Sequence, residues 1–135
     1  MTKHRAQCQC GQLVLECDTD PDFTIACNCK ACQLRSGSPF GAALYLRLAD
    51  ISVSGTVKSW RRTADSGRWL ENHFCPDCGT NLYWTLEMRP EYTGVAYGCF
   101  TTPVPDPIRA IWTEQKHGWV EFPESWPSYE KGSPS

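Results

Sequence analysis

Apolar and polar residues alternate along several short segments of the chain, and this two-residue period is typical of β-strands buried on one face. The clearest segment, FGAALYLRL, places five side chains on a single face: Phe40, Ala42, Leu44, Leu46 and Leu48. In GQLVLEC, Leu13 and Leu15 share a face. In TNLYWTLEM, the side chains expected on one side are Leu82, Trp84, Leu86 and Met88. The pattern predicts a mainly β chain.

Glycine and proline interrupt these segments. Ten glycines and ten prolines suit a loop-rich, antiparallel β architecture. The segments ISVSG and TVKSWRR flank Gly55 and predict a short hairpin, and RWLENHF, GVAYGCF and PIRAIWTEQ are further candidate strands. No helical stripe is evident, and a single helical turn is expected around residues 30–34. The tail from Pro123 is expected to be irregular and frayed at its end.

Length and charge restrict the classes of protein that need consideration. The 135 residues fit a single domain, 1–135, and 13 basic residues against 15 acidic ones form no basic stripe. We therefore expect no nucleic-acid partner. No apolar run approaches the roughly 20 residues that cross a bilayer, so no membrane partner is expected. The N-terminus carries charge without the apolar run of a secretory signal, so a cytoplasmic location is the expectation.

Nine cysteines are many for a chain of this length, and most fall into three groups. Disulfides are unfavourable in a reducing compartment, where cysteines at short spacings indicate metal binding or catalysis. The groups are Cys8 and Cys10, then Cys27, Cys29 and Cys32, and finally Cys75 and Cys78. The sequence therefore predicts metal sites.

The third group is the most specific. A Cys-x-x-Cys-Gly run forms a tight turn with both sulfurs facing inward, and zinc binds such sulfurs at about 2.3 Å. Cys8 and Cys10 are expected on an extended strand, where residues i and i+2 point to the same face. Together with Cys75 and Cys78 they would complete a closed four-cysteine zinc site, whose role would be structural.

The middle group then has three thiols and no assigned fourth ligand. Three protein ligands plus one exchangeable position is the pattern of catalytic zinc. Spacing alone leaves two alternatives open. Cys29 and Cys32 can pair with Cys75 and Cys78 in one ribbon, or another residue can supply a fourth ligand: Cys17, Cys99, His4, His73 or His117.

The isolated residues have simpler interpretations. Cys17 and Cys99 are expected to be small apolar fillers, because free cysteine is usually buried. Six tryptophans should mostly be core, with one or two forming an aromatic wall beside the open metal position. The arginines of SWRRTADSGR, at 61, 62 and 68, can hold substrate carboxylates.

The cysteine groups, in this order, resemble the family of glutathione-dependent formaldehyde-activating enzymes, which also includes centromere protein V. The residues that carry the resemblance are CQCG at 8–11, CNCKAC at 27–32 and FCPDCGTNLYW at 74–84, with support from the segment around Gly55 and from AIWTEQKHGWVEF near the end. The resemblance covers a core of about residues 5–127.

This resemblance implies a β-tent of small antiparallel sheets stabilised by zinc, with two ions per chain. By the family's pattern, Cys8, Cys10, Cys75 and Cys78 would hold a structural zinc. Cys27, Cys29 and Cys32 would hold the catalytic zinc. One position departs from the family, because Asn28 stands where members usually have histidine.

The resemblance also implies a carbon–sulfur lyase activity. A small-molecule thiol such as glutathione would take the fourth position on the zinc and combine with formaldehyde to give S-hydroxymethylglutathione. The proton donor is expected to be Tyr45, Tyr97 or a water. Cationic partners for the carboxylates of glutathione would come from Lys30, Arg35, Arg61 and Arg62.

A second interpretation makes the protein a non-catalytic, zinc-stabilised binding module in which both metal sites are structural. The two interpretations differ in the coordination of the middle group. A fourth protein ligand there favours the module, whereas an exchangeable position favours the enzyme. A third interpretation leaves the middle group without metal.

Overall fold

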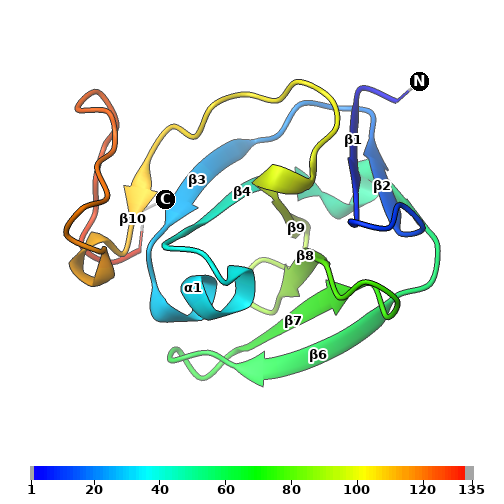
Figure 1. Cartoon of the computed structure of the whole chain (residues 1–135), viewed down its shortest axis with the longest axis horizontal. Coiled ribbons are helices and arrows are strands. Elements are labelled where there is room, and N and C mark those ends of the chain that lie inside the picture. Colours follow the sequence, from blue (N-terminus) through cyan, green and yellow to red (C-terminus); the bar gives the residue numbers. More distant parts are fainter. Residues whose placement is uncertain (1, 133–135) are drawn as a thin grey trace.

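The chain folds into two β-sheets, and one short α-helix connects two neighbouring strands of the larger sheet (Figure 1). A computed structural model describes residues 2–132. Its strands are β1 His4–Gln7, β2 Val14–Cys17, β3 Phe23–Cys27, β4 Gly41–Arg47, β5 Ile51–Ser54, β6 Lys58–Thr63, β7 Trp69–Phe74, β8 Asn81–Leu86, β9 Tyr92–Ala96 and β10 Ala110–Ile111. The small sheet has the order β1-β2-β5 and the large sheet β10-β3-β4-β9-β8-β7-β6. The predicted mainly β fold is confirmed.

Helical structure is sparse, as the sequence indicates. The helix α1 spans Lys30–Ser36, begins after Cys29 and ends at Gly37, whose φ of 66° lies in the left-handed region. The expected turn around residues 30–34 is thus the first part of a helix. Three 3₁₀ turns cover Leu48–Asp50, Tyr97–Cys99 and Thr113–Gln115. Within residues 2–132, no helix has the length and apolarity needed to cross a membrane.

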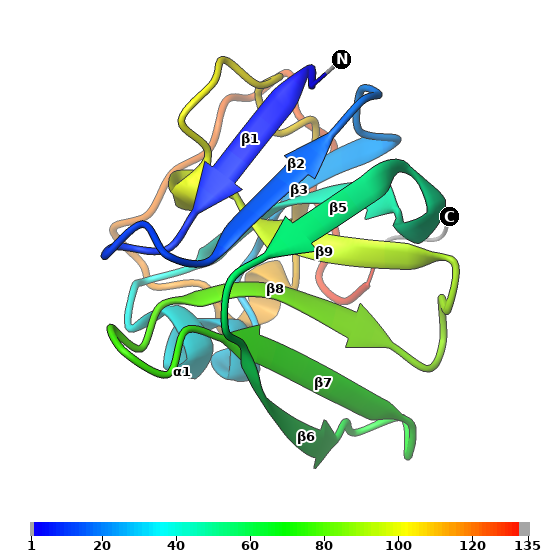
Figure 2. The same ribbon diagram turned by 90° about the vertical axis from the view of Figure 1, so that its right-hand side faces the viewer.

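The core lies between the two sheets, where Figure 2 shows the small sheet crossing in front of the large one. Leu13 and Leu15 are fully buried there, so their predicted shared face is confirmed. Their partners in this cluster are Ala6, Cys8, Cys17, Leu46, Cys75, Leu82, Tyr83 and Val95. Two cysteine groups therefore contribute thiols to the packed interior, since Cys8 and Cys75 belong to the cluster.

The two faces of β4 line two different parts of the protein. Leu44 and Leu46 are fully buried, as the sequence predicts. The opposite face, with Gly41, Ala43 and Tyr45, lines a cavity. The predicted stripe ends at Leu46, because the chain turns into the first 3₁₀ segment there and leaves Leu48 partly exposed.

A β-bulge changes the predicted facing of β8. The register with β7 shifts between His73 and Phe74, so one extra residue of β8 is inserted opposite that step. Leu82 therefore joins Tyr83 in the core between the sheets, whereas Trp84 faces the cavity. The prediction that Leu82 and Trp84 share a face is wrong for this reason.

The predicted hairpin around Gly55 is also wrong. β5 pairs with β2 in the small sheet, and β6 pairs with β7 in the large one. The chain thus crosses between sheets at Gly55, whose φ is 101°. A Cβ atom there would lie 2.1 Å from the carbonyl oxygen of Gln12. This close approach, rather than a hairpin turn, requires the glycine.

The C-terminal part adds one parallel strand to the otherwise antiparallel large sheet. β10 pairs with β3 through two residues only, so the strand predicted from PIRAIWTEQ is much shorter than expected. The tail, predicted to be irregular, returns along β10: Tyr129 N–H donates to Ala110 O at 3.0 Å, and Trp112 N–H donates to Lys131 O at 3.0 Å. The expected frayed end, residues 133–135, lies outside the described residues.

The crossing between the sheets generates a stability prediction. Gly55→Ala adds left-handed strain and a backbone overlap, and should lower the free energy of unfolding by about 2–5 kcal/mol. Gly67→Ala is the matched control, because Gly67 has a φ of 84° but no atom within 4 Å of its added Cβ. The Gly67→Ala substitution adds backbone strain alone and should lower the free energy of unfolding by about 1–2 kcal/mol. Urea unfolding measures both, and equal losses would contradict the assigned role of Gln12.

Candidate functional site

Four thiols converge where two turns distant in sequence meet. Cys8 and Cys10 follow β1, Cys75 and Cys78 lie between β7 and β8, and all four Sγ atoms lie within 4.8 Å of one another. Cys10 Sγ is 3.6 Å from Cys8 Sγ and 3.7 Å from Cys75 Sγ. Thiolates bound tetrahedrally to zinc at about 2.3 Å are about 3.8 Å apart, so this arrangement fits such an ion.

Both halves of this four-thiol group are tight turns that close with a glycine. Gly11 N–H donates to Cys8 O at 3.0 Å, and Gly79 N–H donates to Cys75 O at 2.9 Å. The φ angles of these glycines are 85° and 80°. The expectation that Cys8 and Cys10 lie on an extended strand is therefore wrong: β1 ends at Gln7, and the turn brings their sulfurs together.

Several N–H groups point at the sulfurs of the four-thiol group. Leu13 N–H donates to Cys8 Sγ at 3.3 Å, and the side chain of Gln12 donates to Cys75 Sγ at 3.0 Å. The hydroxyl and then the backbone N–H of Thr80 lower the pKa of Cys78 to about 5. Donors of this kind stabilise thiolates, the form in which cysteine binds metal. The cysteine spacing gave no signal for Gln12.

The three-thiol group is built at the junction of β3 and α1. Cys27 ends β3, Cys29 is the N-cap of α1, and Cys32 lies in its first turn. Their Sγ atoms all lie within 4.8 Å of one another, with Cys27 and Cys29 at 3.5 Å. Hydrogen bonds from the thiols of Cys27 and Cys32 lower the pKa of Cys29 to about 2. The group therefore favours a thiolate and can hold a metal ion.

The two groups are separate, which excludes the single ribbon. Among residues 2–132, no further His, Cys, Asp or Glu joins either group. The other candidates for a fourth ligand have different surroundings: Cys17 is buried in the core, Cys99 packs against it, His4 contacts Asp20, His73 contacts Ser59 and Thr85, and His117 contacts Gln33.

Asn28 is fully buried within the three-thiol loop and faces away from the cavity. Its side-chain N–H donates to Ile111 O at 3.0 Å, and its backbone N–H donates to the same oxygen at 3.0 Å. Gln33 donates to Asn28 O at 2.9 Å. Asn28 therefore fastens the loop to β10. Because it does not line the cavity, its side chain is not placed to exchange a proton there.

A cavity of about 720 Å³ opens beside the three-thiol group, and Cys27, Cys29 and Cys32 form part of its lining. Its aromatic lining residues are Phe23, Tyr45, Trp60, Phe74, Trp84 and Trp112. Its charged lining residues are all arginines, Arg35, Arg62, Arg89 and Arg109. The expected aromatic wall is present and contains three of the tryptophans. Thiols, aromatic rings and guanidinium groups therefore face one space.

The cavity separates the predicted binding residues into two sets. Arg35, Arg62 and Tyr45 line it. The predicted residues that do not line it are Lys30, Arg61, Arg68 and Tyr97. Arg61 lies on the other face of β6, where it pairs with Glu71 at 3.2 Å.

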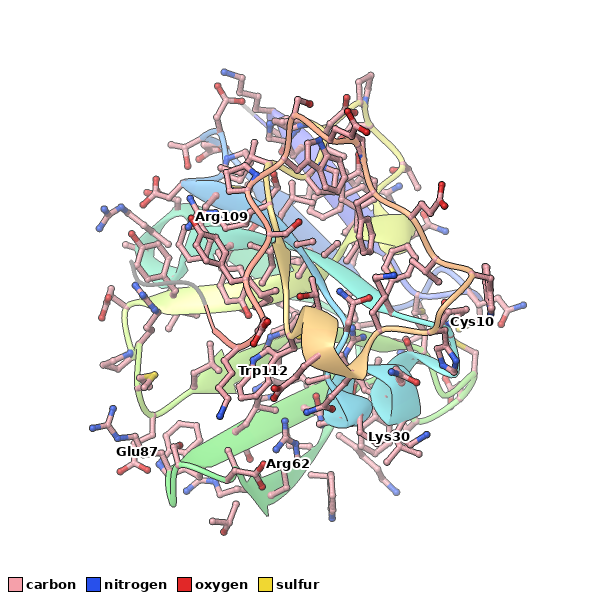
Figure 3. The ribbon with its side chains drawn as sticks, turned by 90° about the vertical axis from the view of Figure 1, so that its left-hand side faces the viewer. Cys10, Lys30, Arg62, Glu87, Arg109 and Trp112 are labelled. Carbon is pink, nitrogen blue, oxygen red and sulfur yellow. The ribbon has the colours of Figure 1, made fainter. Side chains whose placement is uncertain are left out.

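The sequence reasoning missed several cavity residues, among them Arg89, Arg109 and Trp112. In Figure 3, Arg109 and Trp112 lie on the same side of the molecule as Arg62. Trp112 is the one non-glycine residue between positions 2 and 132 with a positive φ, 56°. Strained backbone of this kind concentrates at functional sites.

The sequence model of the glutathione-dependent formaldehyde-activating enzyme family matches residues 3–117. The chain belongs to this family. The match includes both thiol groups and every strand of the two sheets.

Two individual proteins are similar to this member of the family. One is an uncharacterized lyase of Schizosaccharomyces pombe, to which this chain is 26% identical over 84 residues. This aligned region covers 62% of this chain and 58% of the yeast protein. The match thus spans less than two thirds of that relative. A crystal structure of a Rhodobacter sphaeroides protein has a TM-score of 0.59 at 22% identity, covering 75% of this chain and 91% of that one. The latter likeness concerns the fold, and it agrees with the expected β-tent.

The burial of Asn28 generates a second prediction. Asn28→Ala removes the side-chain hydrogen bond to Ile111, and should lower the free energy of unfolding by about 1–3 kcal/mol. Lys30→Ala, at an exposed position on the neighbouring helix, is the control and should change it by less than about 0.5 kcal/mol. Denaturant titrations of both variants measure the difference. Equal stability of the two variants would show that the bond to β10 does not hold the loop.

Proposed function

We propose that the protein is a zinc-dependent carbon–sulfur lyase that forms and cleaves S-hydroxymethylglutathione from glutathione and formaldehyde. The observation that carries this proposal is the three-thiol group, which opens onto the cavity and has no fourth protein ligand within residues 2–132. Three protein ligands with an exchangeable position are typical of catalytic zinc. The family name and the lyase designation of the yeast relative support the same reaction class.

The two thiol groups take different roles in this proposal. Cys8, Cys10, Cys75 and Cys78 hold a structural zinc, because four thiolates leave no vacant position. Cys27, Cys29 and Cys32 hold the catalytic zinc, which supplies a positive charge that favours the thiolate form of a substrate sulfur at neutral pH. Both roles require reduced cysteines, which suits a cytoplasmic location.

The reaction conserves all atoms. In synthesis, the glutathione sulfur attacks the carbonyl carbon of formaldehyde, a C–S bond forms, and the carbonyl oxygen takes up the proton that the thiol has lost. Cleavage reverses these steps: the hydroxyl loses its proton, the C–S bond breaks, and the sulfur recovers the electron pair. The protein must therefore orient the sulfur and supply or accept one proton at the oxygen.

Tyr45 is the proposed proton donor, because it carries the one hydroxyl group among the described residues that line the cavity. Burial raises the pKa of Tyr45 to about 12, so the phenol stays protonated at neutral pH. The charges of Cys32 and Cys27 raise this pKa as well, so the phenol is within electrostatic range of the three-thiol group although its backbone lies farther along β4. The indole N–H of Trp84 donates to the Tyr45 oxygen at 3.4 Å. That contact orients the phenol and leaves its own O–H available for the substrate oxygen.

Arg35 and Arg62 are the proposed partners of the glutathione carboxylates. The guanidinium of Arg35 lies 4.2 Å from the centroid of the Trp84 ring, a cation–π contact that fixes its plane. It also packs closely against Gly41, where an added Cβ would lie 2.6 Å from its terminal nitrogen. A guanidinium fixed in this way can offer two parallel N–H groups to one carboxylate.

The turnover test uses the exchange between formaldehyde and its glutathione adduct, followed by NMR exchange spectroscopy. The zinc-loaded protein should accelerate exchange in proportion to its concentration. Tyr45→Phe should lower the acceleration by about 10²–10³, the size of a general acid–base contribution, without changing the far-UV circular dichroism spectrum. Tyr97→Phe, outside the cavity, is the control. Absence of any acceleration by the loaded wild type would favour the non-catalytic binding module.

The division of roles between the thiol groups predicts different outcomes for two cysteine variants. Cys78→Ser opens the closed site at the edge of the core and should unfold or aggregate the protein, because metal binding there contributes to folding. Cys29→Ser should leave the fold mostly intact and abolish exchange catalysis. Thermal unfolding and zinc content per chain distinguish the two cases. Comparable destabilisation by both variants would show that the three-thiol group is structural too.

A further inference from the structure

The floor of the cavity is a strip of paired residues that leads away from the three-thiol group. On β3 and β4 the cavity-facing pairs, in order from the thiols, are Cys27–Gly41, Ile25–Ala43 and Phe23–Tyr45. Four residues of extended chain separate the first pair from the last, which is about 13 Å at 3.3 Å per residue. The strip therefore continues far beyond the thiols.

Beyond the thiols, the side chains of this strip form a mostly apolar slot, in which the one hydroxyl group is that of Tyr45, held against the indole of Trp84. Arg35 and Cys32 pack over Gly41, so the small side chain that leaves space in the slot is that of Ala43. Phe23 stacks on Tyr45 at the far end, with ring centroids 4.7 Å apart. Leu70 and Leu86 face the same space from β7 and β8. Such a surface binds an apolar or aromatic group, because its burial removes hydrocarbon from water.

The charges around the slot have one sign. The charged lining residues are the four arginines, with no Asp or Glu among them. Arg35, Arg62 and Arg89 have no carboxylate within 4 Å in the described part of the chain. At the far end, the guanidinium of Arg89 lies 5.7 Å from the centroid of the Phe23 ring. The cavity thus attracts an anion with an apolar body.

The mouth of the cavity is apolar as well. Leu34, Trp60 and Met88 line it and are 73%, 59% and 58% exposed. A cavity of about 720 Å³ lies in the range of about 300–1,000 Å³ that is typical of drug-sized ligands. A hydroxymethyl group carries one carbon and is too small to fill the slot over Ile25 and Ala43.

We infer that this site accepts anionic thiol adducts whose carbonyl-derived half is apolar, with an aromatic aldehyde as the best-fitting class. The inference rests on the proposed lyase function and extends it to a larger substrate. The sulfur lies at Cys27, Cys29 and Cys32, the apolar arm lies over Ile25 and Ala43, and the carboxylates of the thiol face the arginines. Cleavage then releases the thiol and the aromatic aldehyde, with the same movement of one proton and one electron pair as for the formaldehyde adduct.

Two stable thioethers test this inference by calorimetry without turnover. S-Benzylglutathione and S-methylglutathione correspond to the benzaldehyde and formaldehyde adducts without the hydroxyl group, and neither can be cleaved by the proposed reaction. The benzyl compound should bind to the zinc-loaded protein about 10- to 100-fold more tightly, because it buries one additional ring. Equal affinity, or tighter binding of the methyl compound, overturns the inference, as does the absence of binding by both.

Two substitutions locate the binding. Ala43→Leu fills the middle of the slot. It should lower the affinity for S-benzylglutathione by more than about tenfold and change the affinity for S-methylglutathione by less than about threefold. Arg62→Gln should lower the affinity for both compounds by about fivefold. The matched control is Arg61→Gln, on the opposite face of β6, which should leave both affinities unchanged. An unchanged benzyl affinity in Ala43→Leu overturns the placement of the arm. The formaldehyde exchange test uses neither thioether, so failure of the lyase function is detected separately.

Discussion

The alternation of side chains in an extended strand is the constraint on which the rest of this structure depends. Each central strand of the large sheet sends successive residues to opposite faces, so one strand builds both the core and the cavity. In β4, Leu46 packs between the sheets while Ala43 and Tyr45 line the cavity. The small sheet covers one face, and the other face carries a second buried cluster around Ile25, Ala43 and Trp84, which forms part of the cavity lining. A single sheet therefore separates a packed interior from a cavity.

This alternation also explains how much of the fold the sequence could predict. The buried faces around Leu15 and Leu46 followed from the two-residue period alone, because that period is local. The bulge at Leu82 and the crossing at Gly55 could not be predicted, since both depend on which distant strand pairs with which. The segment PIRAIWTEQ was a candidate strand, but its parallel pairing with β3 could not be predicted. Hydrogen bonds from Ala26 N–H to Arg109 O and from Asn28 N–H to Ile111 O set this pairing, and the returning tail bonds to β10 separately.

In the candidate site, too, local features could be predicted from the sequence and long-range ones could not. Cysteine spacing identified the cysteines of both thiol groups. Cysteines that are close in sequence lie in one local turn, and the geometry of such a turn depends little on long-range contacts. The guanidinium groups were harder to predict. Arg61 and Arg62 are equivalent in the sequence but face opposite sides of β6, and only strand pairing determines which one reaches the cavity. Arg89 and Arg109 come from connecting segments. Asn28, which departs from the family pattern, is a structural fastening of the loop rather than a cavity residue.

Three of the six tryptophans, Trp60, Trp84 and Trp112, line the cavity. Because indole emission depends on the polarity and the quenching groups around the ring, the protein carries an intrinsic optical reporter at this position. Trp84 is the most constrained of the three: an added Cβ on Gly94 would lie 2.3 Å from its indole nitrogen, and Arg35 covers its ring. Trp60 is mostly exposed at the mouth. Entry of a ligand should therefore change the fluorescence of the rigidly held Trp84 and that of the exposed Trp60 in different ways.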